Sequence, residues 1–82
     1  MLDALKQAPR RAVGAKAVLR ALAAGKAQRV FLAQDADGFL CDRILIACRE
    51  AGVDAVCCGT MRQLGKICGI EVKAACAAIL CL

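Results

Sequence analysis

Three short apolar runs, separated by helix-forming segments, most constrain what this chain can fold into. The runs are "RVFLA" at 29–33, "DAVCC" at 54–58 and "AACAAILCL" at 74–82. An uninterrupted apolar run of this length is typical of a strand buried on both faces of a sheet. The last run also fits a buried helix, because alanine has no strand preference. The alternation predicts a single α/β domain over residues 1–82, a three-layer α/β/α sandwich with a small mixed β-sheet.

Two of the helix-forming segments begin with recognisable start signals. Gly14 precedes "AKAVLRALAAGK", a strongly helix-forming stretch that Gly25 closes. Thr60 and Gln63 have the spacing of a capping box, in which each side chain bonds the other residue's backbone N–H. The capping box predicts a short helix in "MRQLGKIC".

Asp35 and Asp37 precede a third, amphipathic segment, "FLCDRILIACREAG". Two carboxylates before a helix are more often a turn residue and an N-cap than a catalytic pair, so we expect Asp37 to be the cap. Gly52 should end this helix. A short helix, "LDALKQA", is expected before Pro9, whereas "RAV" at 11–13 is too short to assign. Four side chains of this third helix should face the core: Leu40, Ile44, Cys48 and Ala51.

The residue types argue against catalysis and against a metal site. The chain contains no histidine and no serine, so a nucleophile with its base is hard to assemble. We therefore expect neither enzymatic activity nor a cofactor. The seven cysteines include no C-x-x-C pair, which favours small buried hydrophobic residues over zinc ligands. A redox role for the thiols is a distant alternative.

The apolar content, 61% of the 82 residues, does not predict a membrane protein. No stretch reaches 18 uncharged apolar residues, the length that a membrane span needs. The start "MLDALKQAPRR" has an early acidic residue and lacks the apolar centre of a signal peptide. We therefore expect a monomeric, cytoplasmic protein.

The positive charge is concentrated at the start of the chain. Residues 1–29 carry seven basic side chains and one acidic one, whereas residues 30–82 carry five basic and six acidic ones. The formal net charge of +5 is therefore contributed by the first third. Such asymmetry indicates a polyanionic partner for that part of the chain, although a merely solvated surface would also account for it.

The segment around Gly14 could bind such a polyanion. Glycine before a helix allows a sugar–phosphate backbone to come close, and the helix N-terminus favours phosphate. Lys16 and Arg20 then project from the same side, four residues apart. That spacing suits guanine acceptors or neighbouring phosphates, but the pattern is weak by itself.

The "GIEV" loop at 69–72 is the second candidate surface. Ile70 and Val72 flank Glu71, so apolar side chains beside an acceptor could pack on an unstacked base and bond its edge. The simpler reading is that these residues lead into the last core strand. The preceding glycines, Gly65 and Gly69, lack dinucleotide-site spacing, so we expect a helix end and a close approach of the backbone there.

Together, "VGAKAVLRALAAGKAQRVFLAQDAD" and "LGKICGIEVKAACAAIL" resemble the L7Ae/L30e-type kink-turn RNA-binding family of ribosomal proteins, nearest its small bacterial YbxF-type members. The resemblance covers essentially the whole chain in order and spacing. It implies an α/β/α sandwich that binds the kink-turn, a sharply bent RNA with tandem sheared G·A pairs. It further implies that Gly14 admits the RNA backbone, that Lys16 reads guanine, and that Arg20 supplies a basic group one turn later.

The resemblance also assigns a role to the loop at 69–72, which matches the family's "GIEV" without change. Ile70, Glu71 and Val72 would cover the flipped-out nucleotide of the bend. With this loop, the expected partner is structured RNA, ribosomal RNA included.

Three positions depart from the family pattern. Ala15 stands where the family has Thr, and Ala17 stands where it has Glu or Gln, so a hydroxyl and a guanine-edge acceptor are absent. Each good base-edge contact contributes roughly 1–3 kcal/mol of discrimination, so selectivity for the G·A pairs should be reduced. Gly38 replaces a frequent proline and should affect only the turn. The alternative hypothesis is a protein–protein adaptor of the same fold with a weakened RNA site.

Overall fold

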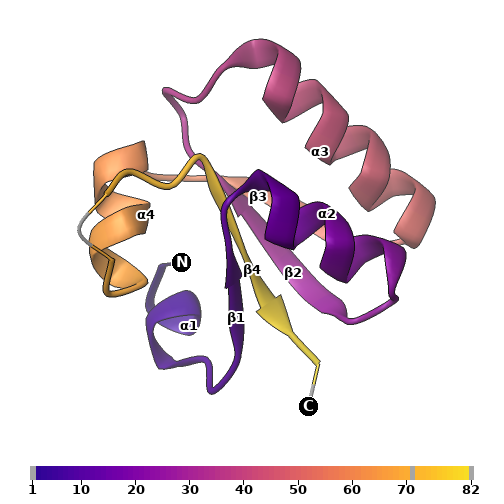
Figure 1. Ribbon diagram of the computed structural model, residues 1–82, viewed down its shortest axis with the longest axis horizontal. Coiled ribbons are helices and arrows are strands. Elements are labelled where there is room, and N and C mark those ends of the chain that lie inside the picture. The colour runs from indigo at the N-terminus through magenta and orange to yellow at the C-terminus, as the bar shows by residue number, and fades with distance from the viewer. Residues whose placement is uncertain (1, 71, 82) are drawn as a thin grey trace.

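The computed structural model describes residues 2–70 and 72–81. Eight elements alternate between helix and strand along the chain (Figure 1). In order they are α1 (Leu2–Gln7), β1 (Arg11–Val13), α2 (Ala15–Ala23), β2 (Ala27–Leu32), α3 (Gly38–Ala51), β3 (Asp54–Cys57), α4 (Met61–Ile67) and β4 (Cys76–Leu80).

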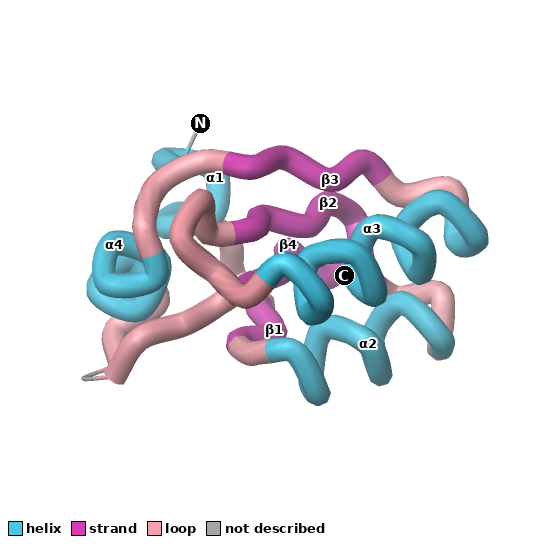
Figure 2. Tube along the Cα trace, turned by 90° about the horizontal axis from the view of Figure 1, so that it is seen from above, coloured by secondary structure: helices cyan, strands magenta, loops and turns pink. Residues whose placement is uncertain are grey.

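The four strands form one mixed sheet in the order β1-β4-β2-β3, as Figure 2 shows. β4 pairs antiparallel with both β1 and β2, and β2 pairs parallel with β3. α1 and α4 lie on one side of the strands and α2 and α3 on the other (Figure 1). The predicted α/β sandwich with helices on both faces of a mixed sheet is therefore confirmed.

Small side chains allow the helices to approach both faces of β4. Cys76 and Ala78 are fully buried in the core beneath α2 and α3. Ala77, between them, is fully buried in the second core, beneath α1 and α4. Side chains that alternate between two cores require the two-residue period of a strand. The strand interpretation of the last apolar run is thus confirmed over the helical one.

The capping predictions are confirmed in detail. The Asp37 carboxylate accepts a hydrogen bond from the Leu40 backbone N–H at 3.1 Å, and Gly52 ends α3 in the left-handed conformation with φ +69°. At α4, the Thr60 hydroxyl accepts from the Gln63 N–H at 3.2 Å, and the Gln63 side chain accepts from the Thr60 N–H at 2.8 Å. These local bonds fix where both helices begin.

Three expectations about the strands and the core are wrong or incomplete. The unassigned "RAV" is β1, which pairs with β4 at the far end of the chain, so no local pattern marks it. The strand "DAVCC" is not buried: β3 is an edge strand whose first and last residues, Asp54 and Cys57, are exposed. Ala51 is exposed rather than inward-facing, because it borders a shallow open groove between α2 and α3.

Arg11 belongs to the basic first third of the sequence, but its side chain has a structural role. Its side chain is half-buried, and its Nη1 donates to the carbonyl of Ile67 at 3.1 Å and to that of Leu5 at 3.5 Å. These carbonyls belong to the last turn of α4 and to α1, where helix dipoles favour a cation. Arg11 therefore links the two helices on that face of the sheet.

The cysteines divide by burial. The cysteines in the two cores are buried, as expected. The cysteines of the edge strand and near the chain end are exposed or half-buried, so the expectation of burial is wrong there. The groups are buried Cys48, Cys68 and Cys76, half-buried Cys41 and Cys58, and exposed Cys57 and Cys81.

Cys76 should make stability depend on pH in the alkaline range. Burial raises the pKa of Cys76 to about 11, with smaller contributions from the neighbouring thiols of Cys41 and Cys48. An unfolded-chain thiol titrates near 8.5, so the stabilisation is complete below about pH 8.5 and is lost as pH rises toward 11. Between these values we expect the free energy of unfolding to fall by roughly 2–3 kcal/mol more for wild type than for Cys76→Ala.

Urea unfolding under reducing conditions at pH 8, 9, 10 and 11 measures this difference. An equal decline for wild type and Cys76→Ala would show that another group causes it.

Candidate nucleic-acid interface

The start of α2 presents backbone donors without partners inside the helix. Gly14 adopts φ +92° at the N-cap, a conformation that favours glycine, and it has no side chain to cap the helix. Its own N–H donates to the Cys76 carbonyl at 2.9 Å, and its carbonyl accepts from Val18 at 3.0 Å. The N–H groups of the following turn, at residues 15–17, have no acceptor within the helix and carry its positive dipole end.

Lys16 and Arg20 lie on the solvent side of the same helix. Both side chains are exposed, whereas Val18 and Leu22 on the opposite side are buried against the sheet. Two like charges four residues apart repel each other on an isolated helix. Their pairing is thus unfavourable for α2 alone and is suited to an anion that bridges them.

Ala15 and Ala17 are both half-buried, packed against the core beneath α2 and α3. They therefore offer only methyl groups beside the exposed Lys16. A longer polar side chain at 17 would have solvent available on its open side. The two departures from the family pattern leave the first turn with backbone donors and one lysine.

The loop at 69–72 turns directly out of α4. Gly69 has φ +76°, which reverses the chain, and the Ile70 N–H donates to the Gly65 carbonyl at 3.0 Å. Ile70 is half-buried against the core beneath α1 and α4, whereas Val72 is 69% exposed. Glu71 lies outside the described residues. Of the two apolar loop residues, Val72 is the one that faces solvent.

Gly65 allows the loop to lie against α4. A Cβ at this buried position would overlap the backbone carbonyl oxygen of Val72 and lie 3.2 Å from its carbonyl carbon. The expected close approach of the backbone is therefore confirmed at Gly65, and the expected helix end is confirmed at Gly69.

The two candidate segments lie at the same end of β4, a central strand of the sheet. The loop runs into β4, whose first residue, Cys76, accepts the hydrogen bond from Gly14. Two further bonds join the segments at this end of the strands: Ala33 N–H to the Ala75 carbonyl at 2.9 Å, and Gln34 N–H to the Gly59 carbonyl at 2.8 Å. The start of α2 and the loop are thus held by one short strand.

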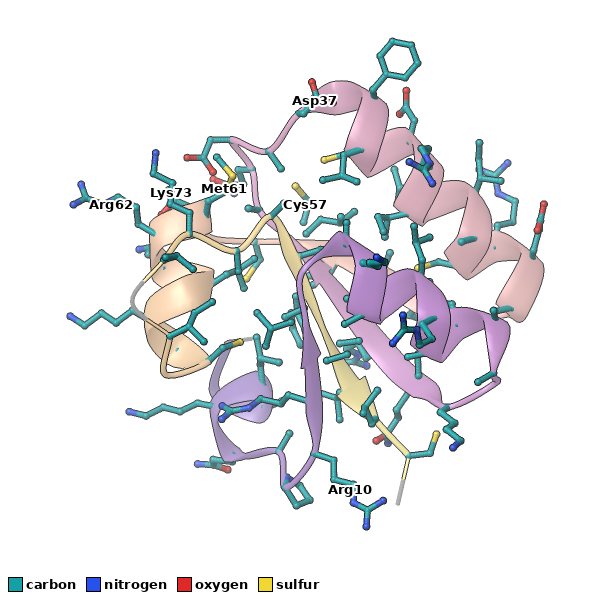
Figure 3. The ribbon with its side chains drawn as sticks, in the orientation of Figure 1. Arg10, Asp37, Cys57, Met61, Arg62 and Lys73 are labelled. Carbon is teal, nitrogen blue, oxygen red and sulfur yellow. The ribbon has the colours of Figure 1, made fainter. Side chains whose placement is uncertain are left out.

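Sequence reasoning missed three basic residues that border the loop. Arg62 and Lys66, one turn apart on α4, are exposed, and so is Lys73, which directly follows the loop at 69–72. Ala74 N–H donates to the Met61 carbonyl at 3.0 Å, which brings Lys73 and Arg62 onto adjacent backbone, and both point outward in Figure 3. Counting charge along the chain hid this group, because the six acidic residues of 30–82 offset the five basic ones in the total.

The remaining chemistry-bearing groups have structural roles. Asp35 Oδ1 accepts from the Met61 N–H at 2.8 Å, at the start of α4, so this carboxylate supports a different helix from Asp37. Among the described residues, no three His, Cys, Asp or Glu side chains are grouped so that they could hold a metal ion. In the same part of the chain, no helix combines the length and apolar character needed to span a bilayer.

Gly65→Ala tests the contact between the loop and α4. Alanine in an exposed helix stabilises by up to about 1 kcal/mol over glycine. Here its methyl group would overlap the Val72 carbonyl, so we expect destabilisation by roughly 1–3 kcal/mol, measured by urea unfolding.

Gly38→Ala provides the matched control, since a Cβ there meets nothing within 4 Å and its φ is not positive. Equal stability changes in the two variants would contradict the contact.

Comparisons with known proteins identify the family. The chain matches the ribosomal protein L7Ae/L30e/S12e/Gadd45 family over residues 1–81. An RNA-binding protein of Caldanaerobacter subterraneus is 44% identical over 70 residues, 85% of each chain. The RNA-binding protein YbxF of Geobacillus stearothermophilus is 40% identical over 74 residues, 90% of each chain.

A solved structure supports the same assignment. The 15.5kD RNA binding protein of Giardia lamblia has a TM-score of 0.80 and 33% identity, and the match covers 94% of this chain and 63% of the Giardia chain. This chain therefore spans under two thirds of the Giardia protein. The family resemblance seen in the sequence is confirmed: the chain belongs to the ribosomal protein L7Ae/L30e/S12e/Gadd45 family.

Proposed function

We propose that this chain is a non-enzymatic, cytoplasmic protein that binds structured RNA, and that its target is a kink-turn. One observation carries the proposal: the open N-terminus of α2, with exposed Lys16 and Arg20, lies at the same end of the central strand β4 as the loop that exposes Val72. Relatives at 40–44% identity that are named RNA-binding proteins support it.

The mechanism is selection of the bent RNA. Backbone N–H groups at 15–17 would bind a phosphate, with Gly14 leaving room for the sugar–phosphate chain. Lys16 would reach guanine O6 or N7 in the opened groove, and Val72 would cover the unstacked nucleotide. A protein that binds only the bent conformation shifts the RNA population toward it by mass action.

The first turn of α2 sets the expected selectivity. Ala15 and Ala17 provide no side-chain hydrogen bonds to a G·A pair, so recognition would rest on Lys16 and on RNA shape. One copy should bind one bend with moderate discrimination against disrupted G·A pairs. The adaptor alternative, which Ala17 favours, requires that this discrimination be absent.

Lys16→Ala should reduce affinity for an intact kink-turn by about tenfold to a hundredfold, the loss expected for one base-edge contact. Lys26→Ala removes the same charge beyond the other end of α2 and should cost much less. Both variants should bind a straight duplex nearly as well as wild type does. Gel shift at fixed salt, with intact and G·A-disrupted kink-turns, gives the affinity ratios.

Wild type without a preference for the intact bend would refute the kink-turn proposal. In the same assay, Ala17→Glu supplies an acceptor and should raise the intact-to-disrupted ratio, even where negative charge limits the gain in raw affinity. An unchanged ratio would place residue 17 outside the base-reading contact.

The basic group beside the loop should appear in the salt dependence of binding. Each phosphate that a protein neutralises adds roughly 0.7–0.9 to the slope of log affinity against log salt. A triple variant with glutamine at Arg62, Lys66 and Lys73 should therefore flatten the slope by up to about 2–3. Glutamine at Lys26 and Arg29, at the opposite end of the strands, serves as the control. Equal slopes for wild type and the triple variant would exclude these side chains from the interface.

A further inference from the structure

Cys57, the last residue of β3, faces the side of the sheet that α3 covers. It pairs in register with Leu32 of β2, which belongs to the core beneath α2 and α3. The preceding residue, Val56, packs against the other core, and successive side chains of a strand point to opposite faces. Because β3 is at the edge of the sheet, Cys57 is still exposed. Its thiol is therefore accessible to solvent on the side of α3.

Cys41 lies on α3 above the same end of the sheet. Its half-buried side chain packs against the core beneath α2 and α3, and its thiol donates to the Ala36 carbonyl at 3.9 Å. Ala36 belongs to the turn between β2 and α3, so this contact holds the thiol near the carboxyl end of β2. β2 and β3 are parallel, so Cys57 lies at that end too. Figure 3 shows Cys57 at the same end of the sheet as Asp37, the N-cap of α3.

The electrostatics of Cys41 agree with this placement. Burial raises the pKa of Cys41 most, and the thiol of Cys57 raises it further, ahead of Asp37 and Asp42. A neighbouring ionisable group has such an effect only at short range. The topology thus brings an exposed thiol and a half-buried one together on one face of the sheet.

We propose that Cys41 and Cys57 are a site of reversible oxidation, where a small-molecule disulfide converts the two thiols into a disulfide that links α3 to β3. The Cys57 thiolate attacks one sulfur of the reagent and displaces one thiol, which leaves Cys57 in a mixed disulfide. The Cys41 thiolate then attacks the Cys57 sulfur and displaces the second thiol. Two protein thiols are oxidised, one reagent disulfide is reduced to two thiols, and both protons end on those products.

Exposure sets the order of these steps and limits them to this pair. Cys57 meets the reagent first, because Cys41 is half-buried and the nearby Cys76 is fully buried. Cys58 follows Cys57 directly, and the alternation of the strand turns its side chain toward the other face. Cys81, the other exposed cysteine, lies at the opposite end of β4, where its N–H donates to the Lys26 carbonyl at 2.7 Å.

The location of the pair gives the disulfide a structural effect. It closes residues 41–57 into a loop that contains most of α3 and all of β3. A cross-link of this kind stabilises the fold by restricting the unfolded chain. In a reducing compartment the thiols stay reduced and are oxidised only transiently, as a redox-responsive site requires. The inference does not depend on RNA binding.

Oxidation of fully reduced, RNA-free protein with oxidised glutathione at low protein concentration tests the site. The number of free thiols should fall from seven to five, with the loss of two hydrogen atoms by mass spectrometry and no change in oligomeric state. Tryptic digestion without reduction should yield residues 30–43 joined to residues 50–62, the peptides that contain Cys41 and Cys57. Dithiothreitol should restore all seven thiols.

Single variants separate the two roles. Cys41→Ser should retain one glutathione on Cys57, because no second thiol displaces it, and Cys57→Ser should form neither the adduct nor the linked peptide. Cys58→Ser is the matched control and should oxidise as wild type does. Oxidation should raise the thermal midpoint of wild type by about 4–8 °C or more and leave that of Cys57→Ser unchanged.

Every other result overturns the proposal. Wild type that keeps seven free thiols, or that stops at the glutathione adduct, would show that Cys41 does not reach Cys57. A linked peptide that survives in Cys57→Ser would assign the reaction to Cys58. Disulfide-linked dimers as the sole product would show that the exposed cysteines react only between copies. A lower thermal midpoint after oxidation would mean that the bond distorts the fold instead of joining neighbouring elements.

Discussion

The rest of the structure depends on β4, a strand of small side chains enclosed on all sides. It pairs with β1 and β2 and presents alternate residues to two separate cores. With cysteine and alanine at 76–78, the helices on both faces come close without a large side chain between them. A larger residue at any of these positions would have to displace a helix, because packed interiors have little free volume. This constraint allows 82 residues to form three layers.

The same strand positions both candidate surfaces. Its first residue bonds Gly14 at the start of α2, and the loop with Ile70 and Val72 precedes it. The distance between the start of α2 and the loop is therefore set by β4 and by the close contact of Gly65 with the loop backbone. If RNA binds here, the candidate interface is largely formed before the ligand arrives, which would reduce the conformational entropy lost on binding.

Local chemistry made most of the fold predictable from the sequence. Capping by Asp37 and by Thr60 with Gln63 depends on neighbours within three residues, and both were identified correctly. By contrast, β1 forms only through a partner at the far end of the chain, and β3 is at an edge that depends on strand order. Neither relation leaves a local pattern. The same limit applies to the candidate interface, where Lys73 and Arg62 come onto adjacent backbone only after folding.

Two adjacent helices on one face of the sheet use charge in opposite ways. On α2, Lys16 and Arg20 repeat one sign at a spacing of four, which concentrates potential and suits a polyanion. On α3, two acidic and two basic residues balance, so this helix adds no net charge to the same face. Net charge measures only the first arrangement. The placement of charge on each helix therefore carries information that the net charge of the whole chain omits.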